Sequence, residues 1–368
     1  MDSPFSYTFY RTTGQAWEAM YGAILGARKS VYWETYILVD DEAGNRFVDA
    51  MCEKAKLGLD VKLVVDAMGS INLSRLAEMR LRASGVKFVW FNRLSPGIYL
   101  REWFRRVWYR SHRKVLIIDE EIAFVGGVNV RQSSAEWYDL HVRLTGRTVR
   151  HFLYGFAKDY IYAGGNRKEV RHLLYPKLAS RLDEWREQAR AIVHAPFLAG
   201  NRAPFRRLYH QALEFAKTSF TLVTPYYVPD RDFLRLISKA KARGVDVDII
   251  LPMRPDMRLM QFMNKQFYLA TIEAGAKIHL LRRMNHAKGV SVDHSVGVIG
   301  SANMNPRSLS INQEAGVIFT EERMVNELNS ILDDWKDESV ALDKQDLQRK
   351  GWVDRIKSWW ADKIKDYV

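Results

Sequence analysis

The sequence predicts an α/β protein made of two repeated halves, each with a mainly parallel sheet and flanking helices. Three observations support this fold class. The order of strand-like and helix-like segments occurs twice, one group of polar residues recurs at the same spacing in both copies, and the 368 residues are 47% hydrophobic and 27% charged. That length and composition are ordinary for a folded protein with two cores.

The first copy alternates strand-like and helix-like segments. Residues 27–36 include a β-rich run, and they are followed in turn by Phe47 to Lys56, Gly58, Val61 to Val65, Gly85 and Val86 to Phe91. Phe47 to Lys56 has a helical pattern, and Val61 to Val65 and Val86 to Phe91 have a strand pattern. A parallel crossover needs a connection about as long as a helix, so this order predicts parallel strands.

The second copy repeats this order. Residues 216–226 correspond to residues 27–36, and they are followed by Phe233 to Ala242, Gly244, Val245 to Ile250, Gly275 and Ala276 to Leu281. We therefore expect a first half over residues 1–165 and a second half over residues 191–340. Residues 166–190, which are polar and helix-like, would form a connecting helix. Residues 341–368 would form a basic amphipathic carboxyl-terminal segment.

The first half carries an insertion of sixteen residues, which covers most of residues 94–111. Its aromatic side chains recur at helical spacing with arginines between them, and they include Trp103, Phe104 and Trp108. An amphipathic helix with an arginine face is suited to the lipid interface. A helix packed on the protein core fits the periodicity equally well, and the same two alternatives apply to the carboxyl-terminal segment.

The charge balance points to an anionic partner. The chain has 56 Lys and Arg against 43 Asp and Glu, a formal net charge of +13, which attracts polyanions such as nucleic acid or an anionic lipid surface. No run approaches the roughly 18 apolar residues of a membrane-spanning helix, and the first thirty residues lack the pattern of a secretory signal. Cys52 is the only cysteine, which excludes an internal disulfide, so we expect a reducing, intracellular setting.

A group of polar residues recurs with identical spacing in the two halves. The first copy is His112-x-Lys114-x4-Asp119-x6-Gly126-Gly127-x-Asn129, and the second is His286-x-Lys288-x4-Asp293-x6-Gly300-Ser301-x-Asn303. A single copy would be interpreted as a strand with a surface histidine and lysine. Two copies at corresponding points of a repeat indicate one shared site.

These residue types suit chemistry on a phosphodiester. A histidine and a lysine two positions apart on a strand point to the same face, and the turns at Gly127 and Ser301 would let the backbone approach a ligand closely. Two imidazoles, two ammonium groups and two amides would then surround a tetrahedral anion. One imidazole can attack phosphorus, the other can protonate the leaving alcohol, and the remaining donors can stabilise the oxygens.

The duplicated motif resembles the signature of the phospholipase D superfamily, and the resemblance extends from about Tyr10 to Trp335. Within that superfamily the sequence is most similar to bacterial cardiolipin synthases, because short motifs of both halves match. These are Trp33-Glu34-Thr35-Tyr36-Ile37, Asp66-x-x-Gly69-Ser70, Arg113-Lys114, Pro225-Tyr226-Tyr227-x-Pro229 and Asn303-x-x-x-Arg307-Ser308-Leu309. The resemblance implies the pseudo-twofold phospholipase D fold.

The resemblance also implies a covalent phosphatidyl-histidine intermediate that forms without a metal or cofactor. We expect His112 to be the nucleophile and His286 to be the general acid and then the base. Asp139 and Glu314 lie ten and eleven residues after the two motif asparagines, where the family places the carboxylates that orient its histidines. Which carboxylate serves which imidazole is left open by the sequence.

Further residues complete the predicted site. Asp119 and Asp293 belong to the motif, and we expect them to brace the strand and turn, since another anion beside the substrate would repel it. Tyr36, Tyr226 and Tyr227 follow predicted core strands and are expected to line the substrate tunnel, with core packing as the alternative. The other histidines show no metal-ligand spacing, and no paired-cysteine or HExxH pattern occurs, so we predict no metal.

The leading hypothesis is a phosphatidyltransferase that moves a phosphatidyl group from phosphatidylglycerol, or another phospholipid donor, to a glycerol-bearing phospholipid acceptor. Phosphatidylethanolamine and cardiolipin are further candidate substrates. We expect peripheral attachment to the anionic cytoplasmic face of a bacterial inner membrane. The alternatives are a phospholipase D hydrolase that releases phosphatidic acid, and a phosphodiesterase that acts on nucleic acid. We do not expect nucleic acid to be a partner of this protein. Intact motifs in both halves argue against a non-catalytic lipid-binding module.

Overall fold

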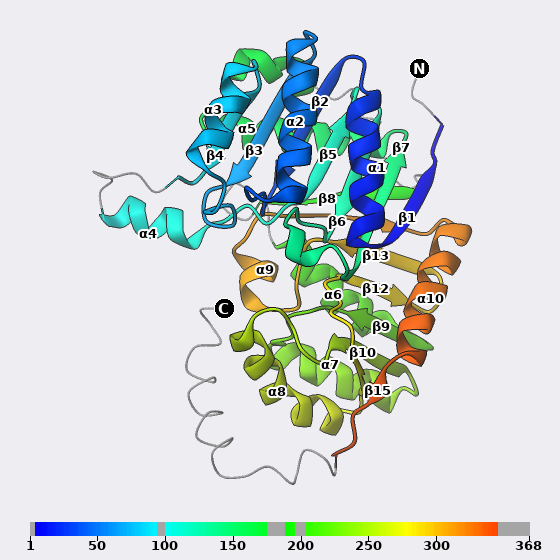
Figure 1. Ribbon diagram of the computed structural model, residues 1–368. Helices are drawn as coiled ribbons and strands as arrows, with labels where there is room; N and C mark the ends of the chain where they lie inside the picture. Colours follow the sequence, from blue (N-terminus) through cyan, green and yellow to red (C-terminus); the bar gives the residue numbers. More distant parts are fainter. Residues whose placement is uncertain (1–3, 94–99, 175–187, 196–202, 345–368) are drawn as a thin grey trace.

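The computed structural model describes residues 4–93, 100–174, 188–195 and 203–344 of the chain. Two sheets, each covered on its outer face by helices, form the two halves (Figure 1). The first sheet has seven strands in the order β1-β7-β6-β5-β2-β3-β4, and the second has eight in the order β15-β11-β10-β9-β12-β13-β14-β8. The predicted fold class of two repeated α/β halves is confirmed.

Helices and strands follow one another along the chain in a similar order in the two halves. The first half contains β1 (Tyr7–Thr12), α1 (Thr13–Gly26), β2 (Ser30–Thr35), α2 (Glu42–Lys56), β3 (Asp60–Asp66), α3 (Arg75–Ala83), β4 (Lys87–Phe91), α4 (Leu100–Trp108), β5 (Val115–Ile118), β6 (Ile122–Gly126), the 3-10 helix η1 (Gln132–Ser134), β7 (Tyr138–Thr145), α5 (Thr148–Tyr162) and the 3-10 helix η2 (Arg167–Leu174). The second half contains β8 (Ala189–His194), α6 (Pro204–Phe215), β9 (Ser219–Val223), α7 (Arg231–Ala242), β10 (Asp246–Pro252), α8 (Arg258–Glu273), β11 (Lys277–Leu281), β12 (Gly289–Val292), β13 (Val296–Gly300), α9 (Pro306–Ser310), β14 (Glu314–Phe319), α10 (Glu322–Asp337) and β15 (Val340–Ala341).

The pairing of the strands repeats between the halves. Strands β2, β3 and β4 pair in parallel, as do β9, β10 and β11. Strands β5, β6 and β7 pair antiparallel, as do β12, β13 and β14. Each half also begins with an antiparallel edge strand: β1 pairs with β7, and β8 pairs with β14. The repeat found in the sequence is therefore a repeat of topology.

Both sheets are mixed, so the expectation of mainly parallel sheets is wrong. The reason is a tight turn inside each motif. Residues 119–121 connect β5 to β6, with φ of 54° at Asp119 and 62° at Glu120, and residues 293–295 connect β12 to β13, with φ of 51° at Asp293 and 50° at His294. A tight turn with positive φ at two successive positions makes an antiparallel hairpin. The alternation of strands with helices predicted the parallel part of each sheet and not the hairpins after it.

Two predicted segments are described only in part. Where a connecting helix was expected over residues 166–190, Arg167–Leu174 forms the 3-10 helix η2 and residues 189–190 already belong to β8, while residues 175–187 lie outside the described part. Residues 345–368, most of the predicted basic carboxyl-terminal segment, also lie outside the described residues. The insertion of the first half contains helix α4, as its periodicity indicated.

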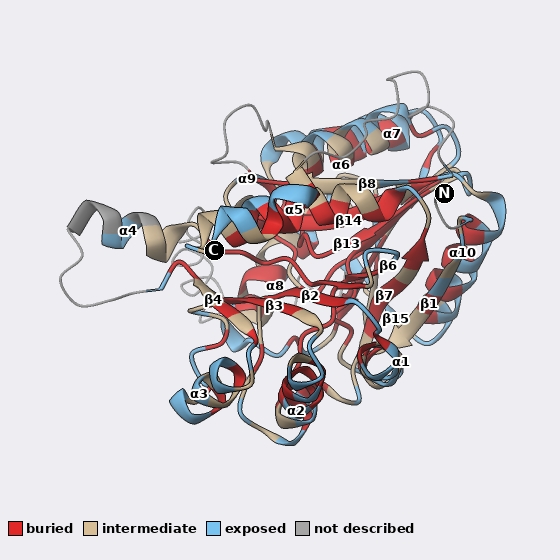
Figure 2. Cartoon of the chain, turned by 90° about the horizontal axis from the view of Figure 1, so that it is seen from above, coloured by how far each residue is buried: buried red, intermediate tan, exposed pale blue. Residues whose placement is uncertain are grey.

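The largest hydrophobic core lies between the two sheets and belongs to both halves. It includes Val115 and Phe152 from the first half and Phe319 and Trp335 from the second, all of them buried. Helices α5 and α10 contribute to this core, whereas α1 to α3 and α6 to α8 cover separate clusters on the outer faces (Figures 1 and 2). The shared core keeps the inner edges of the two halves in fixed contact.

Short backbone pairings join the halves next to the motif histidines. The His112 N–H donates to the carbonyl oxygen of Gln313 (2.9 Å), and the His286 N–H donates to that of Tyr138 (2.7 Å). Each bond lies at an isolated parallel bridge between the halves. Both histidines precede their strands, β5 and β12, and do not lie within them as the sequence pattern suggested. The main chain therefore holds each motif histidine against the opposite half.

Candidate active site

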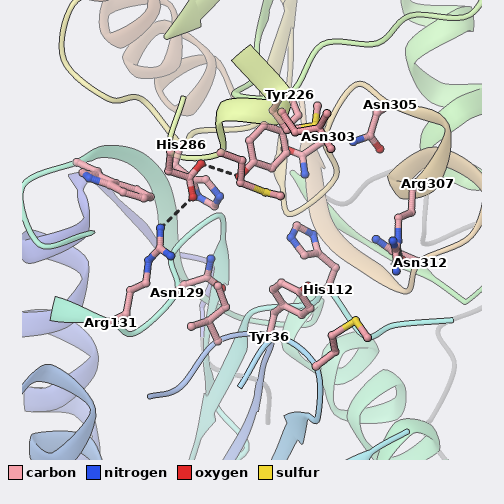
Figure 3. Close-up of a pocket in the computed structure, with 18 residues that line it drawn as sticks. Tyr36, His112, Asn129, Arg131, Tyr226, His286, Asn303, Asn305, Arg307 and Asn312 are labelled. Atoms are coloured by element: carbon pink, nitrogen blue, oxygen red, sulfur yellow. Dashed lines mark hydrogen bonds and ion pairs between the residues drawn. The ribbon is translucent and has the colours of Figure 1, made fainter. Parts of the chain in front are cut away.

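The two motif histidines line one cavity of about 450 Å³ between the halves (Figure 3). The described wall residues come from both halves, from loops at the ends of their strands and from the helices α8 and α9. The described lining residues are Tyr36, Ile37, Met68, Gly69, His112, Asn129, Arg131, Trp137, Tyr226, Asp256, Met257, Leu259, Met260, His286, Asn303, Asn305, Arg307 and Asn312. The duplicated motif thus converges on a single site.

Each imidazole is held by a carboxylate from the other half. His112 Nδ1 lies 3.0 Å from Glu314 Oε2, and His286 Nδ1 lies 2.9 Å from Asp139 Oδ2. All four side chains are buried. A carboxylate on Nδ1 fixes the tautomer and leaves Nε2 as the nitrogen available for chemistry. The crossed pairing settles the geometric question that the sequence left open.

The two pairs differ in how they hold protons. Burial lowers the pKa of His112, while Glu314 opposes this shift and Lys114 adds to it. Burial acts to raise the pKa of Glu314, but His112, Lys114 and the Ser301 hydroxyl together bring it below its usual value. This pair is therefore best described as a carboxylate beside a neutral imidazole at neutral pH.

The other pair retains a proton more readily. Burial raises the pKa of Asp139 to about 7, and the Lys288 ammonium offsets only part of that effect. Burial, with the charges of Lys288 and Lys114, lowers the pKa of His286 well below its usual value. The single proton that Asp139 and His286 share below about pH 7 belongs to the pair and not to one residue.

The motif lysines lie behind the histidines and do not appear among the described residues of the cavity wall. Lys114 Nζ donates to the carbonyl oxygen of His112 (2.7 Å), and Lys288 Nζ donates to that of His286. Burial lowers the pKa of Lys288 to about 8 and that of Lys114 well below its usual value, although nearby carboxylates oppose both shifts. The lysines therefore fix the backbone of the histidines, and burial weakens their hold on the protons that carry their charge.

The motif asparagines and turn residues lie where the sequence placed them. Asn129 and Asn303 line the cavity, and the side-chain oxygen of each is buried without a hydrogen-bond partner among the described residues. Gly127 leaves room for Asp139, since a Cβ at this position would lie 2.1 Å from the Asp139 Oδ1 atom. At the corresponding position the Ser301 hydroxyl donates to Glu314. The two turns thus position the carboxylates and do more than let the backbone approach the substrate.

Asp119 and Asp293 do not line the described cavity wall. Asp119 Oδ1 accepts hydrogen bonds from the backbone N–H groups of Lys29 (2.7 Å) and Ser30 (2.9 Å), at the start of β2. Asp293 Oδ1 accepts the same kind of bonds from Thr218 (2.7 Å) and Ser219 (3.0 Å), at the start of β9. Each aspartate therefore holds its hairpin to the neighbouring strand, which is the bracing that we expected. Neither aspartate lies beside the histidines in the described cavity wall.

Buried ion pairs hold the segment that carries His112. Arg110 Nη2 donates to Asp66 Oδ1 (2.6 Å), and the Ser111 N–H donates to Asp66 Oδ2 (2.9 Å). Arg113 forms an ion pair with Asp159 and is 2% exposed. Because buried ion pairs need precise geometry, this network fixes the backbone on both sides of His112.

The three predicted tyrosines separate into two groups. Tyr36 and Tyr226 line the cavity, and the ring of Tyr36 lies 4.7 Å from that of His112. Tyr227 does not line it, so that expectation is wrong. Its side chain is fully buried in the core of the second half, and its hydroxyl is 2.9 Å from the Thr271 hydroxyl. Adjacent residues of an extended segment point in opposite directions, so only one of Tyr226 and Tyr227 could reach the cavity.

Sequence reasoning missed several residues of the wall. Arg131 Nη2 lies 2.9 Å from Asp256 Oδ2, and the Tyr226 hydroxyl donates to Asp256 Oδ1 (2.7 Å). Asn305 and Asn312 line the cavity beside Arg307, which the sequence motif had included without a role. Asp256 and Met68 follow the parallel strands β10 and β3, and ligands commonly bind beyond the carboxyl ends of such strands. That rule could have found both loops.

Two general properties of the described residues bear on the site. Within the described ranges, no group of three or more histidine, cysteine, aspartate or glutamate side chains could hold a metal ion. Among the helices of the same ranges, none is long and apolar enough to cross a membrane.

Comparisons with known proteins place this geometry in a family. The family model described as "Cardiolipin synthase, PLD-like domain" matches residues 20–154 and 209–335. The chain is 30% identical to a cardiolipin synthase of Geobacillus thermodenitrificans over 361 residues, which cover 95% of this chain and 70% of that protein. It is also 30% identical to a cardiolipin synthase of Clostridium perfringens, with 85% of this chain and 66% of that protein covered.

A solved structure shares the fold. The crystal structure of phosphatidylserine synthase from Haemophilus influenzae superposes with a TM-score of 0.72 at 15% identity, and the match covers 98% of this chain and 95% of that one. At this identity the likeness concerns the fold alone. Each segment matched by the family model contains one copy of the motif, and together the two segments cover more than half of the sequence. The chain therefore belongs to the phospholipase D-like family described as cardiolipin synthase, PLD-like domain.

Proposed function

We propose that this chain is a phosphatidyltransferase that transfers a phosphatidyl group from phosphatidylglycerol to the headgroup hydroxyl of a second phosphatidylglycerol. The observation that carries the proposal is the pair of imidazoles in one cavity, each held at Nδ1 by a carboxylate of the opposite half. Membership of the cardiolipin synthase family supports the phospholipid substrates. Two imidazoles suffice for a two-step transfer, because one can act as nucleophile and the other as acid and base.

In the first step, Nε2 of His112 attacks the phosphorus of the donor. A P–N bond forms, the P–O bond to the headgroup breaks, and His286 Nε2–H gives its proton to the leaving glycerol oxygen. In the second step, the acceptor hydroxyl attacks the same phosphorus while His286 takes its proton. The P–N bond then breaks, and His112 is regenerated. Asn129 and Asn303 are placed to donate their amide N–H groups to the phosphoryl oxygens.

The charge states of the two pairs support this assignment of roles. A nucleophile must begin as a neutral imidazole, and the phosphoimidazolium that it forms is stabilised by an ionised carboxylate. The lowered pKa values of His112 and Glu314 favour that state. A general acid must carry a proton near the operating pH, and the pair of His286 with Asp139, whose pKa is raised to about 7, retains one.

We expect a bell-shaped dependence of kcat/KM on pH. As the pH falls through the lowered pKa of His112, the nucleophile becomes protonated and the rate drops. As the pH rises above about 7, the proton shared by Asp139 and His286 is lost, and the leaving group is no longer protonated. Initial rates with phosphatidylglycerol in mixed micelles, measured from mildly acidic to mildly alkaline pH, test this. A rate that stays level above pH 7 would contradict the assigned acid.

Product analysis tests the function itself. Purified protein incubated with phosphatidylglycerol in mixed micelles should yield diphosphatidylglycerol and free glycerol in equal amounts. Phosphatidic acid without a diphosphatidyl product would indicate a hydrolase instead. Cleavage of DNA that weakens as salt is raised would indicate the phosphodiesterase alternative, because phosphate contacts make such binding sensitive to salt.

The exposed apolar residues near the cavity support a site at the lipid surface. Helix α4 stands out from the first half (Figure 1), with the side chains of Trp103 and Phe104 exposed. Met257 and Leu259, which line the cavity, are exposed as well. Aromatic and basic residues together favour the headgroup region of an anionic bilayer. We therefore place the protein peripherally on the cytoplasmic face of a bacterial membrane, with the cavity toward the lipid.

Replacing Trp103 and Phe104 together by serine should weaken binding to phosphatidylglycerol vesicles by about tenfold or more, because two large apolar side chains no longer enter the interface. Vesicle co-sedimentation measures the change. Phe215→Ser is the matched control, since Phe215 is exposed at the end of α6 and away from the cavity wall. Unchanged binding of the double variant, or an equal loss in the control, would contradict a membrane role for α4.

A further inference from the structure

Among the described residues of the cavity wall, one positive charge has no carboxylate partner. The charged wall residues besides the histidines are Arg131, Asp256 and Arg307. Arg131 and Asp256 form an ion pair, and the other Asp256 oxygen accepts the Tyr226 hydroxyl. Within the described parts of the chain, Arg307 makes no ion pair. The described wall therefore carries one uncompensated guanidinium, which favours an anion in the cavity.

The contacts that Arg307 does make leave most of its hydrogen-bonding capacity for a ligand. Its Nε donates to Asn312 Oδ1 and its Nη2 to the Val107 carbonyl oxygen, both at 3.4 Å, close to the limit for a hydrogen bond. A guanidinium has five N–H donors in a planar fork that matches a phosphate. Asn305 and Asn312 are buried and line the same part of the wall, where their side-chain amides add polar groups beside the guanidinium.

The position of Arg307 separates it from the reacting phosphorus. In the proposed mechanism that phosphorus lies between the two imidazoles. Figure 3 shows Arg307 and Asn312 beyond His112, on the side away from His286. Arg307 also contacts α4 through the Val107 carbonyl oxygen, and its guanidinium carbon lies 5.9 Å from the centre of the Trp108 ring. The cation therefore lies between the chemical centre and the helix assigned to the lipid surface.

We propose that Arg307, with Asn305 and Asn312, binds the unreactive phosphodiester of the acceptor phospholipid. This inference rests on the proposed transfer function. The donor brings one phosphate, which reacts, whereas a phospholipid acceptor brings a second phosphate that must be held while its hydroxyl attacks. A bidentate contact to that phosphate would orient the acceptor and select an anionic lipid over water or a neutral alcohol. Arg307 would thus act as a specificity-determining residue.

Arg307→Gln with two matched acceptors tests the inference. Phosphatidylglycerol serves as donor, and the acceptor is either phosphatidylglycerol itself or monoacylglycerol, which has free glycerol hydroxyls and an acyl chain but no phosphate. We expect the variant to make diphosphatidylglycerol about ten- to a hundredfold more slowly, because a charge-assisted contact is lost. Transfer to monoacylglycerol should stay within about threefold of wild type. Arg307→Lys should recover part of the first rate, since lysine restores the charge without the fork.

Arg235→Gln provides a control, because Arg235 is an exposed arginine of α7 whose ion pair is with Asp232 of the same helix. Equal losses with both acceptors would show that Arg307 serves the reacting phosphate or the fold, and would overturn the inference. Unchanged transfer to both acceptors would overturn it as well. Wild-type protein that makes no diphosphatidyl product would refute the proposed function and the inference with it, and this failure is visible before any variant is compared.

Discussion

Replacing either motif histidine by alanine is expected to lower phosphatidyl transfer by about a thousandfold or more. His112 and His286 act on the same phosphorus in one catalytic cycle, so the loss of either stops the cycle. For the same reason the double variant should be about as slow as each single variant. Initial rates of diphosphatidylglycerol formation measure all three losses.

His172→Ala is the control for this series. His172 lies on the exposed surface near Glu120, outside the cavity wall, and its loss should leave the rate close to that of the wild type. Thermal unfolding of each variant separates a chemical loss from a loss of structure. If His112→Ala or His286→Ala kept more than about a tenth of the activity, a shared site would be the wrong description.

Removing the charge of the crossed carboxylates should cost nearly as much as removing the histidines. Glu314→Gln and Asp139→Asn keep the shape of each side chain, but an amide can present its N–H to Nδ1 and so stabilise the wrong tautomer. We expect losses of roughly a hundred- to ten-thousandfold in kcat. Glu314 contacts His112 and Asp139 contacts His286, so each substituted carboxylate lies in the opposite half from the histidine that it affects.

The pH profile distinguishes orientation from simple structural damage. In Asp139→Asn the group whose pKa is raised to about 7 is gone, so the high-pH limb of the profile should move. Glu314→Gln should leave that limb in place and lower the rate at all pH values. Glu338→Gln is a suitable control, because Glu338 accepts a hydrogen bond from the Tyr138 hydroxyl at the exposed surface. Carboxylate variants with the rate and profile of the wild type would exclude the crossed pairs from the mechanism.

The sequence predicted the parts of this molecule that depend on local spacing. The identical spacing of the two motifs predicted a shared site, and the structure places His112 and His286 in one cavity. The resemblance to the phospholipase D superfamily implied Asp139 and Glu314 as the carboxylates that orient the histidines, and both contact an imidazole. Within each copy of the motif, spacing along the chain fixes the direction of neighbouring side chains in space.

The relations that the sequence could not predict join residues far apart along the chain. The crossed pairing of carboxylates with histidines depends on the bridges between the halves. The Arg131 and Asp256 pair likewise joins loops of different halves. The mixed sheets were missed for a different reason, because the turn at Asp119 and Glu120 was interpreted through its chemistry and not through its conformation.

The most direct test of the central claim uses a donor whose leaving group needs no proton. With phosphatidyl-p-nitrophenol, His286→Ala protein should release one equivalent of p-nitrophenolate per site in a rapid burst, and an alkaline quench followed by mass spectrometry should find the phosphatidyl group on His112. His112→Ala protein should give no burst. A burst from His112→Ala protein, or an adduct on any residue other than His112, would contradict a mechanism in which one imidazole from each half serves a single phosphorus in these separate roles.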